Sequence, residues 1–359
     1  MSIGGVRPAV QAMPAYRPGK AAEQAEEEHG IVDAIKLASN ENPYPPVPSV
    51  VAAINEAATG VNRYCDHLAV ELRTAIGEMV GKDLDSIAVG CGSVGLLQQL
   101  CLAYLDPGDQ VVYPWRSFEA YPVNVQMMGA EAVQVPLVDH AFDLDAVVGA
   151  VTDRTKIIML ATPNNPTGTA LTVDAMRAML AKVPDNVIVL VDEAYREFLD
   201  PSFGDPVELL ADHQNVVVSR TFSKAYGLAG VRVGYLVANP AIVDEVNKVL
   251  VPFAVNGLAQ AAALAALQAR DEYEPFLADI RSERARVVAA LTAVGWSLPD
   301  TQANFVYLPL GERTQDIYVA VEKLGVVTRP FAGEGIRVTI GTAEENDRFL
   351  NALAQVAQP

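Results

Sequence analysis

The chain has 359 residues, 51% of them hydrophobic and 19% charged, which is enough for a large domain with a smaller one beside it and for a sizeable core. Its 26 basic and 44 acidic residues give a net charge of −18 without a basic stripe, which argues against a nucleic-acid binder and against a protein that binds anionic membranes. Three cysteines and four histidines are scattered without metal-ligand spacing, and no signal peptide or membrane span is recognisable, so we expect a cytoplasmic protein with no metal site.

The N-terminal segment is rich in Gly, Pro, Ala and Glu up to residue 30, which favours an extended arm with a charged turn or short helix at 23–28. Tyr16 lies among prolines in this arm, where it would serve as a hydrophobic anchor that holds the arm down. Prolines in the stretch 37–46 exclude a helix interior, so this stretch is expected to cross a surface as ordered coil. Within it, Asn42 before Pro43 favours a turn.

Helix and strand patterns alternate from there onwards, which indicates an α/β fold. Helical spacing predicts helices at residues 48–58, 96–104, 143–150, 174–182, 244–267 and 271–294. Short apolar or alternating runs predict strands at residues 87–89, 110–113, 156–160, 187–191, 216–218, 231–237, 302–308 and 336–341. The last two strands are expected to belong to the smaller domain.

A glycine-rich loop at 90–95 follows the first predicted strand and matches the pattern G-x-G-x-x-G, so a dinucleotide site has to be considered. Such a site needs an acidic residue at the end of the next strand, and that strand runs into Pro114 instead. The helix after the loop can still hold a phosphate at its N-terminus, through the amides of Ser93 and Val94 and the Ser93 hydroxyl.

Polar residues follow three successive predicted strands: Asn165 after the first, Asp192 after the second and Lys224 after the third. Because ligands in parallel α/β sheets bind outside the carboxyl ends of the strands, one pocket can collect these groups. Taken singly, Asp192 could equally cap a helix or bind a metal, and Lys224 could be a solvated surface lysine.

The loop around Lys224 carries a chemical pattern of its own. A lysine between hydroxyls and glycines, just past a strand end, can be desolvated, so that its pKa falls and its neutral amine can attack a carbonyl. Arg232 can hold a phosphate beside this lysine, with hydroxyl donors from Thr221 and Ser223. An imine-forming lysine next to a phosphate site is what pyridoxal phosphate requires.

Together and in this order, the three segments resemble the fold-type I aminotransferases, and more narrowly the branch that contains the histidinol-phosphate and aromatic aminotransferases. The resemblance runs from Tyr16 to Arg337. It implies a large domain with a mostly parallel central sheet plus a smaller α+β domain, pyridoxal 5'-phosphate as cofactor, and amino acids and 2-oxo acids as substrates. We place the N-terminal arm and a small-domain segment at 1–45, the large cofactor-binding domain at 46–260 and the small C-terminal domain at 261–359.

The resemblance also implies roles for the residues around the cofactor. Lys224 is implied to form the imine with the cofactor and to move the substrate proton as general base and acid, and Asp192 to pair with the pyridine nitrogen. Asn165 and Tyr195 are implied to hydrogen-bond the ring hydroxyl oxygen. The residues implied around the cofactor phosphate are Gly92, Ser93, Val94, Thr221, Ser223 and Arg232.

Two aromatic positions carry further implications. Phe118 takes the family's ring-stacking position, with Trp115 as the competitor for that role. Tyr64 lies where the family has the tyrosine of an Arg-Tyr-Pro segment, although Cys65 replaces the proline here. In the family that tyrosine reaches the cofactor phosphate of the partner subunit, which implies a homodimer.

Three residues are implied to contact the substrate. An arginine between β-branched residues on a strand is costly unless it meets an anion, and the resemblance implies that Arg337 binds the substrate α-carboxylate bidentately. Asn40 is implied to lie beside that carboxylate, with turn formation as the structural alternative. Tyr16 is implied to lie over the substrate entrance.

Departures from the family pattern bear on the substrate, because Val94-Gly95 stands where many histidinol-phosphate enzymes carry an acidic pair. The aromatic residues available to wall an apolar pocket are Tyr16, Trp115, Phe118 and Tyr121. We therefore predict an aromatic-amino-acid aminotransferase for phenylalanine and tyrosine, with 2-oxoglutarate as amino acceptor. Histidinol phosphate is the alternative substrate. A nicotinamide-dependent oxidoreductase and an inactive binding protein of the same fold are the alternatives from other classes.

Overall fold

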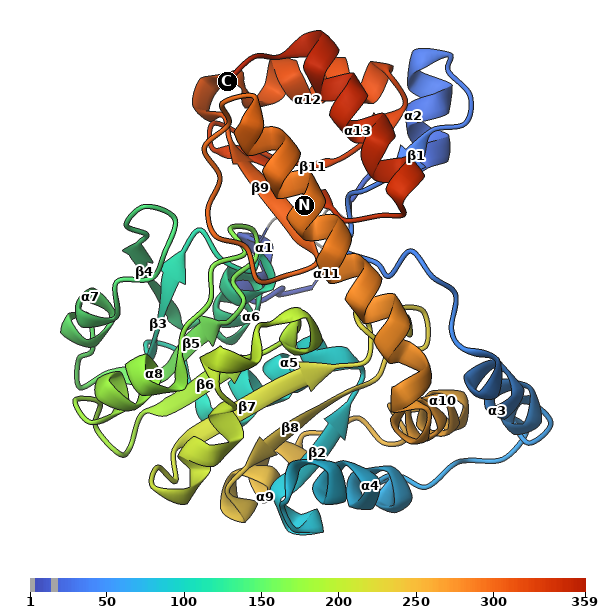
Figure 1. Cartoon of the computed structure of the whole chain (residues 1–359). Coiled ribbons are helices and arrows are strands. Elements are labelled where there is room, and N and C mark those ends of the chain that lie inside the picture. Colours follow the sequence, from blue (N-terminus) through green and yellow to red (C-terminus); the bar gives the residue numbers. More distant parts are fainter. Residues whose placement is uncertain (1–3, 14–18) are drawn as a thin grey trace.

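The computed structural model describes residues 4–13 and 19–359, which form a larger and a smaller lobe (Figure 1). The larger lobe is built on a seven-stranded sheet of order β2-β8-β7-β6-β5-β3-β4. Its strands are β2 Ile87–Gly90, β3 Gln110–Trp115, β4 Glu131–Pro136, β5 Thr155–Ala161, β6 Ile188–Asp192, β7 Val216–Thr221 and β8 Gly234–Ala238. Only β8 runs antiparallel to its neighbours, so the predicted α/β fold with a mostly parallel central sheet is confirmed.

The central strands are apolar throughout because helices cover both faces of the sheet. Along β6, Ile188 and Leu190 join one core cluster and Val189 and Val191 join the other, as expected for side chains that alternate between faces. The helices of this lobe are α3 Pro48–Ala58, α4 Val70–Val80, α5 Gly92–Tyr104, α6 Ala120–Met128, α7 Leu144–Gly149, α8 Val173–Leu180, α9 Pro240–Lys248 and α10 Gly257–Gln268. Helices α5, α6 and α9 contribute to the first cluster, and α4, α8 and α10 contribute to the second.

The smaller lobe combines the C-terminal part of the chain with an N-terminal segment (Figure 1). Strand β1 (Ile35–Lys36) pairs in parallel with β10 (Val326–Val327). Strands β9, β11 and β12 form an antiparallel sheet, with bounds Phe305–Pro309, Arg329–Phe331 and Gly335–Thr339. The helices around these sheets are α2 Ala22–His29, α12 Thr314–Lys323 and α13 Ala343–Val356.

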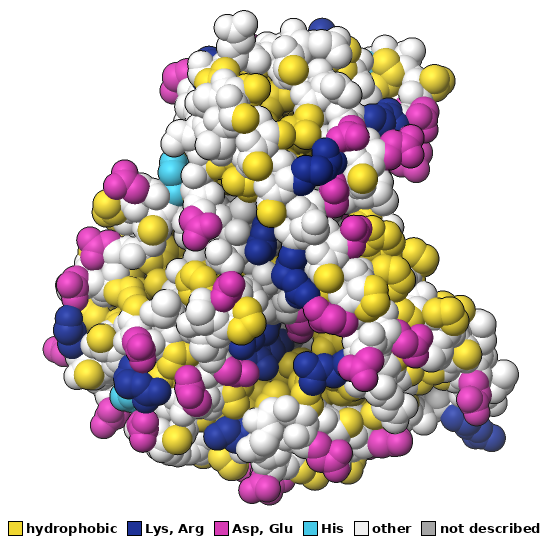
Figure 2. Space-filling model, in the orientation of Figure 1, with side chains coloured by type: hydrophobic (Ala, Val, Ile, Leu, Met, Phe, Trp, Pro, Cys, Tyr) yellow, Lys and Arg dark blue, Asp and Glu magenta, His cyan; other side chains and the backbone are white. Residues whose placement is uncertain are grey.

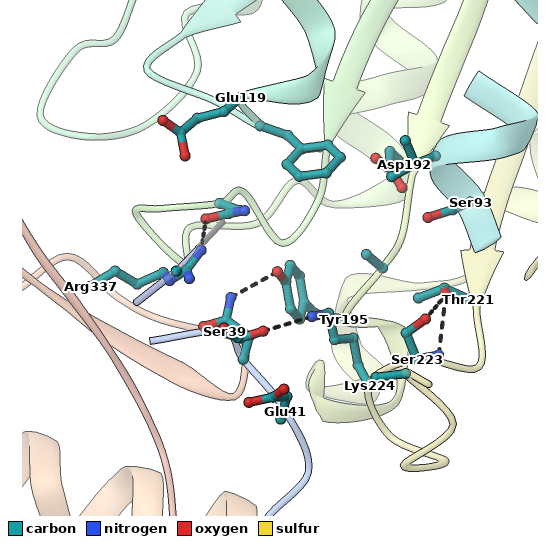
Figure 3. Close-up of a pocket in the computed structure, with 18 of the residues that line it drawn as sticks. Ser39, Glu41, Ser93, Glu119, Asp192, Tyr195, Thr221, Ser223, Lys224 and Arg337 are labelled. Carbon is teal, nitrogen blue, oxygen red and sulfur yellow. Dashed lines mark hydrogen bonds between the residues drawn. The ribbon is translucent and has the colours of Figure 1, made fainter. Parts of the chain in front are cut away.

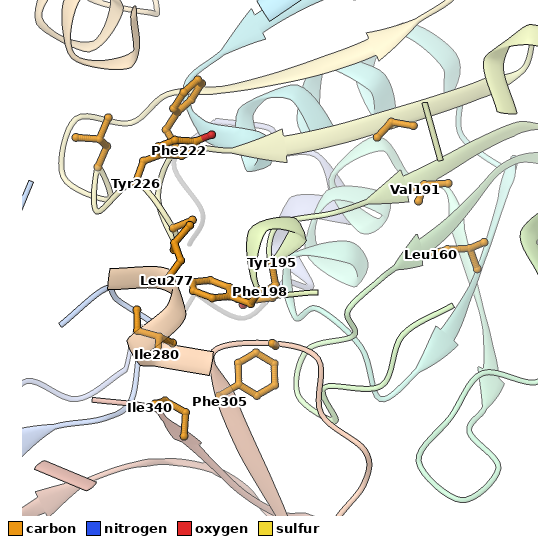
Figure 4. Close-up of a cluster of buried hydrophobic side chains, with 14 of the residues drawn as sticks. Leu160, Val191, Tyr195, Phe198, Phe222, Tyr226, Leu277, Ile280, Phe305 and Ile340 are labelled. Atoms are coloured by element: carbon orange, nitrogen blue, oxygen red, sulfur yellow. The ribbon is translucent and has the colours of Figure 1, made fainter. Parts of the chain in front are cut away.

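Helix α11 (Arg270–Ala293) runs from the larger lobe to the smaller one, and the apolar core is continuous along it (Figure 1). Figure 4 shows Phe198 of the larger lobe beside Leu277 of α11, with Phe305 of β9 next to them. The Tyr195 ring packs edge-on against Phe305, with 5.1 Å between ring centroids. Because the lobes share one core, side chains from both can be held at fixed positions in the space between them.

Three predicted elements were wrong in their bounds, one of them the strand predicted at 302–308, which begins only at Phe305. The helix predicted at 244–267 is two helices, α9 and α10, because Pro252 cannot lie in a helix interior and the Asn256 side chain caps a new helix. The strand predicted at 231–237 begins only at Gly234, because Arg232 has a φ of +63°, which no strand residue adopts.

The remaining helices of the described chain are short. The N-terminal arm carries α1 (Pro8–Gln11), and the short 3₁₀ helices are Leu84–Ser86, Arg196–Phe198, Pro201–Phe203, Pro206–Ala211 and Gly311–Arg313. Among the described residues, no helix combines the length and the apolar character needed to cross a membrane.

Candidate active site

A cavity of about 280 Å³ lies between the lobes, at the edge of the sheet where β5, β6 and β7 end (Figure 3). The predicted site residues that line it are Asn40, Ser93, Val94, Phe118, Asn165, Asp192, Tyr195, Thr221, Ser223, Lys224, Arg232 and Arg337. Figure 2 shows Lys and Arg side chains gathered in the hollow between the lobes. Because the chain as a whole carries a net charge of −18, this concentration of basic groups favours an anionic ligand.

Lys224 lies on the cavity wall just after β7, where its ammonium group donates a hydrogen bond to the Ser39 carbonyl at 3.0 Å. Burial, and after it the nearby charge of Arg337, lower the pKa of Lys224 to about 7. A large fraction of this amine is therefore neutral near pH 7, as a nucleophile or a proton acceptor requires.

Asp192 ends β6 and is buried in the wall of the cavity. One carboxylate oxygen accepts a hydrogen bond from the Tyr121 hydroxyl at 3.0 Å, and the other accepts one from the Ser219 hydroxyl at 2.9 Å. Burial raises the pKa of Asp192, whereas these two hydrogen bonds lower it. A cationic or proton-bearing nitrogen in the cavity would offset the cost of keeping this carboxylate charged.

The N-terminus of α5 meets the loop after β7 in an arrangement suited to an anion. Arg232 donates a hydrogen bond to the Ser223 hydroxyl at 3.2 Å, and the Thr221 hydroxyl lies 3.0 Å from the same oxygen. A Cβ on Gly92, which has a φ of +72°, would lie 2.4 Å from an Arg232 guanidinium nitrogen. A side chain at residue 92 would therefore displace Arg232, so this close approach requires glycine.

Gly234 extends the same cradle, since a Cβ there would lie 2.6 Å from the Ser93 backbone nitrogen. The hydroxyls of Ser93, Thr221 and Ser223, the Arg232 guanidinium and the amides at the start of α5 thus face one corner of the cavity. Hydroxyls, a guanidinium and a helix N-terminus together form a donor set for a phosphate.

On the side of the smaller lobe, Arg337 of β12 donates hydrogen bonds to the Asn165 side-chain oxygen at 2.6 Å and to the Ala38 carbonyl at 2.5 Å. Asn40 has a φ of +53°, and its side-chain nitrogen donates to the Tyr195 hydroxyl at 2.9 Å. These contacts bring residues from four separate parts of the chain onto one wall.

The two aromatic candidates for stacking on the cofactor ring, Phe118 and Trp115, lie in different surroundings. Phe118 lines the cavity and packs edge-on against Tyr121, with 5.7 Å between ring centroids. Within the described chain Trp115 does not line the cavity, and it packs instead against Tyr113 and beneath the Arg116 guanidinium. The geometry therefore favours Phe118 as the residue that faces a bound ring.

Two predicted residues lie elsewhere. Tyr64 is 84% exposed and stacks on Phe253, with 4.4 Å between ring centroids, and it does not line the cavity of the described chain. Tyr16 lies outside the described residues.

Sequence reasoning missed residues that the structure brings to the site. Ser219 holds Asp192, and Glu119 and Arg329 line the cavity; Tyr121, predicted to wall an apolar pocket, is not on the cavity wall of the described chain and instead donates a hydrogen bond to Asp192. No local pattern marks Arg329, because its position depends on the pairing of β11 with β12.

Away from the cavity, ligand atoms of Glu28, His29 and Glu322 come together. The Lys20 ammonium already bridges the two carboxylates, at 2.5 Å from Glu28 and 2.8 Å from Glu322. This group is therefore an ion-pair cluster that ties α2 to α12.

Known proteins resemble the chain over most of its length. The model of the family "Aminotransferase class I and II" matches residues 32–353. The aromatic amino acid aminotransferases of Thermobifida fusca and Streptomyces coelicolor are 50% and 49% identical to the chain, and each match covers 96% of this chain and 95% of the relative. A crystal structure of histidinol-phosphate aminotransferase from Sinorhizobium meliloti in complex with pyridoxal-5'-phosphate superposes with a TM-score of 0.90 at 29% identity, covering 99% of this chain and 98% of the other.

Proposed function

The chain belongs to the aminotransferase class I and II family, and from this premise we propose that it transfers amino groups between aromatic amino acids and 2-oxoglutarate. One observation supports the aromatic assignment: relatives that are about half identical to the chain over nearly their whole length are named aromatic amino acid aminotransferases. The histidinol-phosphate aminotransferase of known structure is more distant, at 29% identity, so histidinol phosphate remains the second candidate substrate.

The enzyme is a pyridoxal-phosphate-dependent transaminase, as the polar segments after the strands predicted. When bound, pyridoxal phosphate supplies an aldehyde that takes up the amino group and an electron-poor ring that draws electrons from the bond being broken. The cavity fits this group: the hydroxyls and guanidinium at the start of α5 suit its phosphate, and buried Asp192 suits its ring nitrogen. Lys224 lies in the same cavity with a neutral amine available.

We assign the proton transfer at the substrate Cα to Lys224, because a group with a pKa of about 7 can both accept and donate a proton at neutral pH. Asp192 is assigned to keep the ring nitrogen protonated, as a carboxylate held by two donors. Tyr195 and Asn165 are assigned to the ring hydroxyl oxygen, and Arg337 is assigned to the substrate α-carboxylate. The Asn165 side-chain oxygen accepts a hydrogen bond from Arg337, which leaves its amide nitrogen as the donor for the ring oxygen.

The remaining cofactor and substrate contacts follow the same proposal. Gly92, Ser93, Val94, Thr221, Ser223 and Arg232 are assigned to the cofactor phosphate. Phe118 is assigned to the face of the ring, and Asn40 acts through its hydrogen bond to Tyr195.

We further propose that the enzyme is a homodimer in which Tyr64 serves the cofactor of the partner subunit. The high exposure of Tyr64, away from the cavity of its own chain, supports this assignment.

Domain boundaries at 45/46 and 260/261 and a cytoplasmic location stay predictions. The first boundary is in keeping with the pairing of β1 with β10 in the smaller lobe.

The substrate is tested by comparing kcat/KM for phenylpyruvate and for imidazole acetol phosphate, with glutamate as the amino donor. We expect a preference for phenylpyruvate. A clear preference for the phosphorylated compound would overturn the aromatic assignment while leaving the transaminase chemistry intact.

A further inference from the structure

Two arginines stand side by side on the cavity wall of the smaller lobe. Arg329 of β11 and Arg337 of β12 are directly opposite partners in the antiparallel ladder, and both line the cavity. Residues directly opposite on antiparallel strands project to the same face, and like charges in such pairs destabilise each other. This wall therefore needs a negative charge beside its guanidinium groups.

Glu119 supplies that charge. Its carboxylate lies 2.7 Å from an Arg329 guanidinium nitrogen, and Glu119 also lines the cavity. Glu119 directly follows Phe118 in the chain, so the backbone that positions the ring-facing aromatic also positions this carboxylate. Figure 3 shows Glu119 at the cavity. The ion pair thus joins the larger lobe to the smaller one across the cavity.

The Glu119–Arg329 pair is accessible enough to exchange partners. The Glu119 side chain is 37% exposed and the Arg329 side chain is 17% exposed. A half-exposed carboxylate can turn into solvent at small cost, and the more buried guanidinium then favours another anion in its place.

On the basis of the function proposed above, we propose that Glu119 is a specificity-determining residue that competes with the second carboxylate of dicarboxylic substrates for Arg329. With an aromatic substrate Glu119 stays paired with Arg329, so this ion pair presents no net charge to the substrate ring. With glutamate or 2-oxoglutarate the distal carboxylate takes the place of Glu119 on Arg329. The Glu119 charge therefore weakens the binding of every substrate that carries a second anionic group, and it weakens the binding of a phosphate more than that of a carboxylate.

The test compares the holoenzyme with Glu119→Gln, which keeps the shape of the side chain and removes its charge. The second-order rate constants of the half-reactions with glutamate and with phenylalanine are measured, together with dissociation constants for glutarate and for pentanoate. We expect the glutamate-to-phenylalanine ratio to rise about three- to tenfold, with glutarate binding more tightly relative to pentanoate by a similar factor.

A double-mutant cycle with Arg329→Gln separates this role from a structural one. Alone, Arg329→Gln should lower the glutamate-to-phenylalanine ratio, and in that background Glu119→Gln should no longer raise it. Glu131→Gln is the matched control, since it removes an exposed carboxylate 2.9 Å from Arg154, outside the cavity.

Two outcomes would overturn the inference: an equal change for the one-carboxylate and two-carboxylate ligands, or an effect of Glu119→Gln that persists without Arg329. If the wild-type enzyme fails to use phenylalanine but the glutarate-to-pentanoate shift appears, the aromatic assignment is wrong and the role of Glu119 stands. If phenylalanine is used and the shift is missing, only the role of Glu119 fails.

Discussion

Replacing Gly92 by alanine should weaken cofactor binding through a steric effect that can be worked out from the structure. The new Cβ would lie 2.4 Å from an Arg232 guanidinium nitrogen, so that this guanidinium has to move away from Ser223. A φ of +72° at residue 92 adds strain of about 1–2 kcal/mol for any L side chain. Losing one charged hydrogen bond to the phosphate costs about 1.5–3 kcal/mol, or roughly 10- to 150-fold in affinity.

The assay is the dissociation constant of the apoenzyme for pyridoxal phosphate and for pyridoxal, which lacks the phosphate. Gly92→Ala should weaken the binding of pyridoxal phosphate roughly 10- to 150-fold and the binding of pyridoxal by much less. It should also lower the thermal stability of the apoenzyme. Gly95→Ala is the matched control in the first turn of α5: its Cβ would lie 3.3 Å from the Cys91 Cβ and 4.0 Å from the Gly90 carbonyl carbon, and alanine favours a helix. Unchanged affinity in Gly92→Ala, or an equal loss in both variants, would refute the assignment of this loop to the phosphate.

Three further expectations concern the groups around the cofactor. Asp192→Asn should lower kcat by at least about 10²-fold, measured by steady-state turnover, and near-normal turnover would rule out Asp192 as the partner of the ring nitrogen. Mixing Tyr64→Phe with Lys224→Ala subunits should restore activity, because the hybrid dimer keeps one intact site; no gain on subunit exchange would mean that each site is built from one chain. The pKa of Lys224 falls from 10.5 to about 7 on folding, so between these pH values the unfolded chain binds more protons than the folded chain. The free energy of unfolding of the apoenzyme should therefore rise with pH in this range, by up to about 1.4 kcal/mol per pH unit from this residue. Denaturant unfolding of Lys224→Met should lose that slope relative to the wild type, and parallel pH curves would contradict the lowered pKa.

Much of the fold and of the chemistry of the site is determined by short stretches of sequence. The all-apolar run that ends in Asp192 defines a buried strand and the charged group at its end, because only a strand covered on both faces is apolar at every position. Lys224 and Arg232 share one loop with their hydroxyl donors, so their combined chemistry is visible without knowing the fold. The shared edge of the parallel sheet then brings these separate stretches together.

Other features depend on which strands and helices become neighbours. The hydrogen bonds from Tyr121 and Ser219 to Asp192 join α6, β7 and β6, and the choice of Phe118 over Trp115 depends on how the loop before α6 packs. The closeness of Arg329 and Arg337, and their encounter with Glu119, depends on strand register and on the approach of the two lobes. Side-chain periodicity tells which residues of one strand share a face, but it does not tell which strand lies beside it. These contacts join residues far apart in the chain, so they are decided only when the tertiary structure forms.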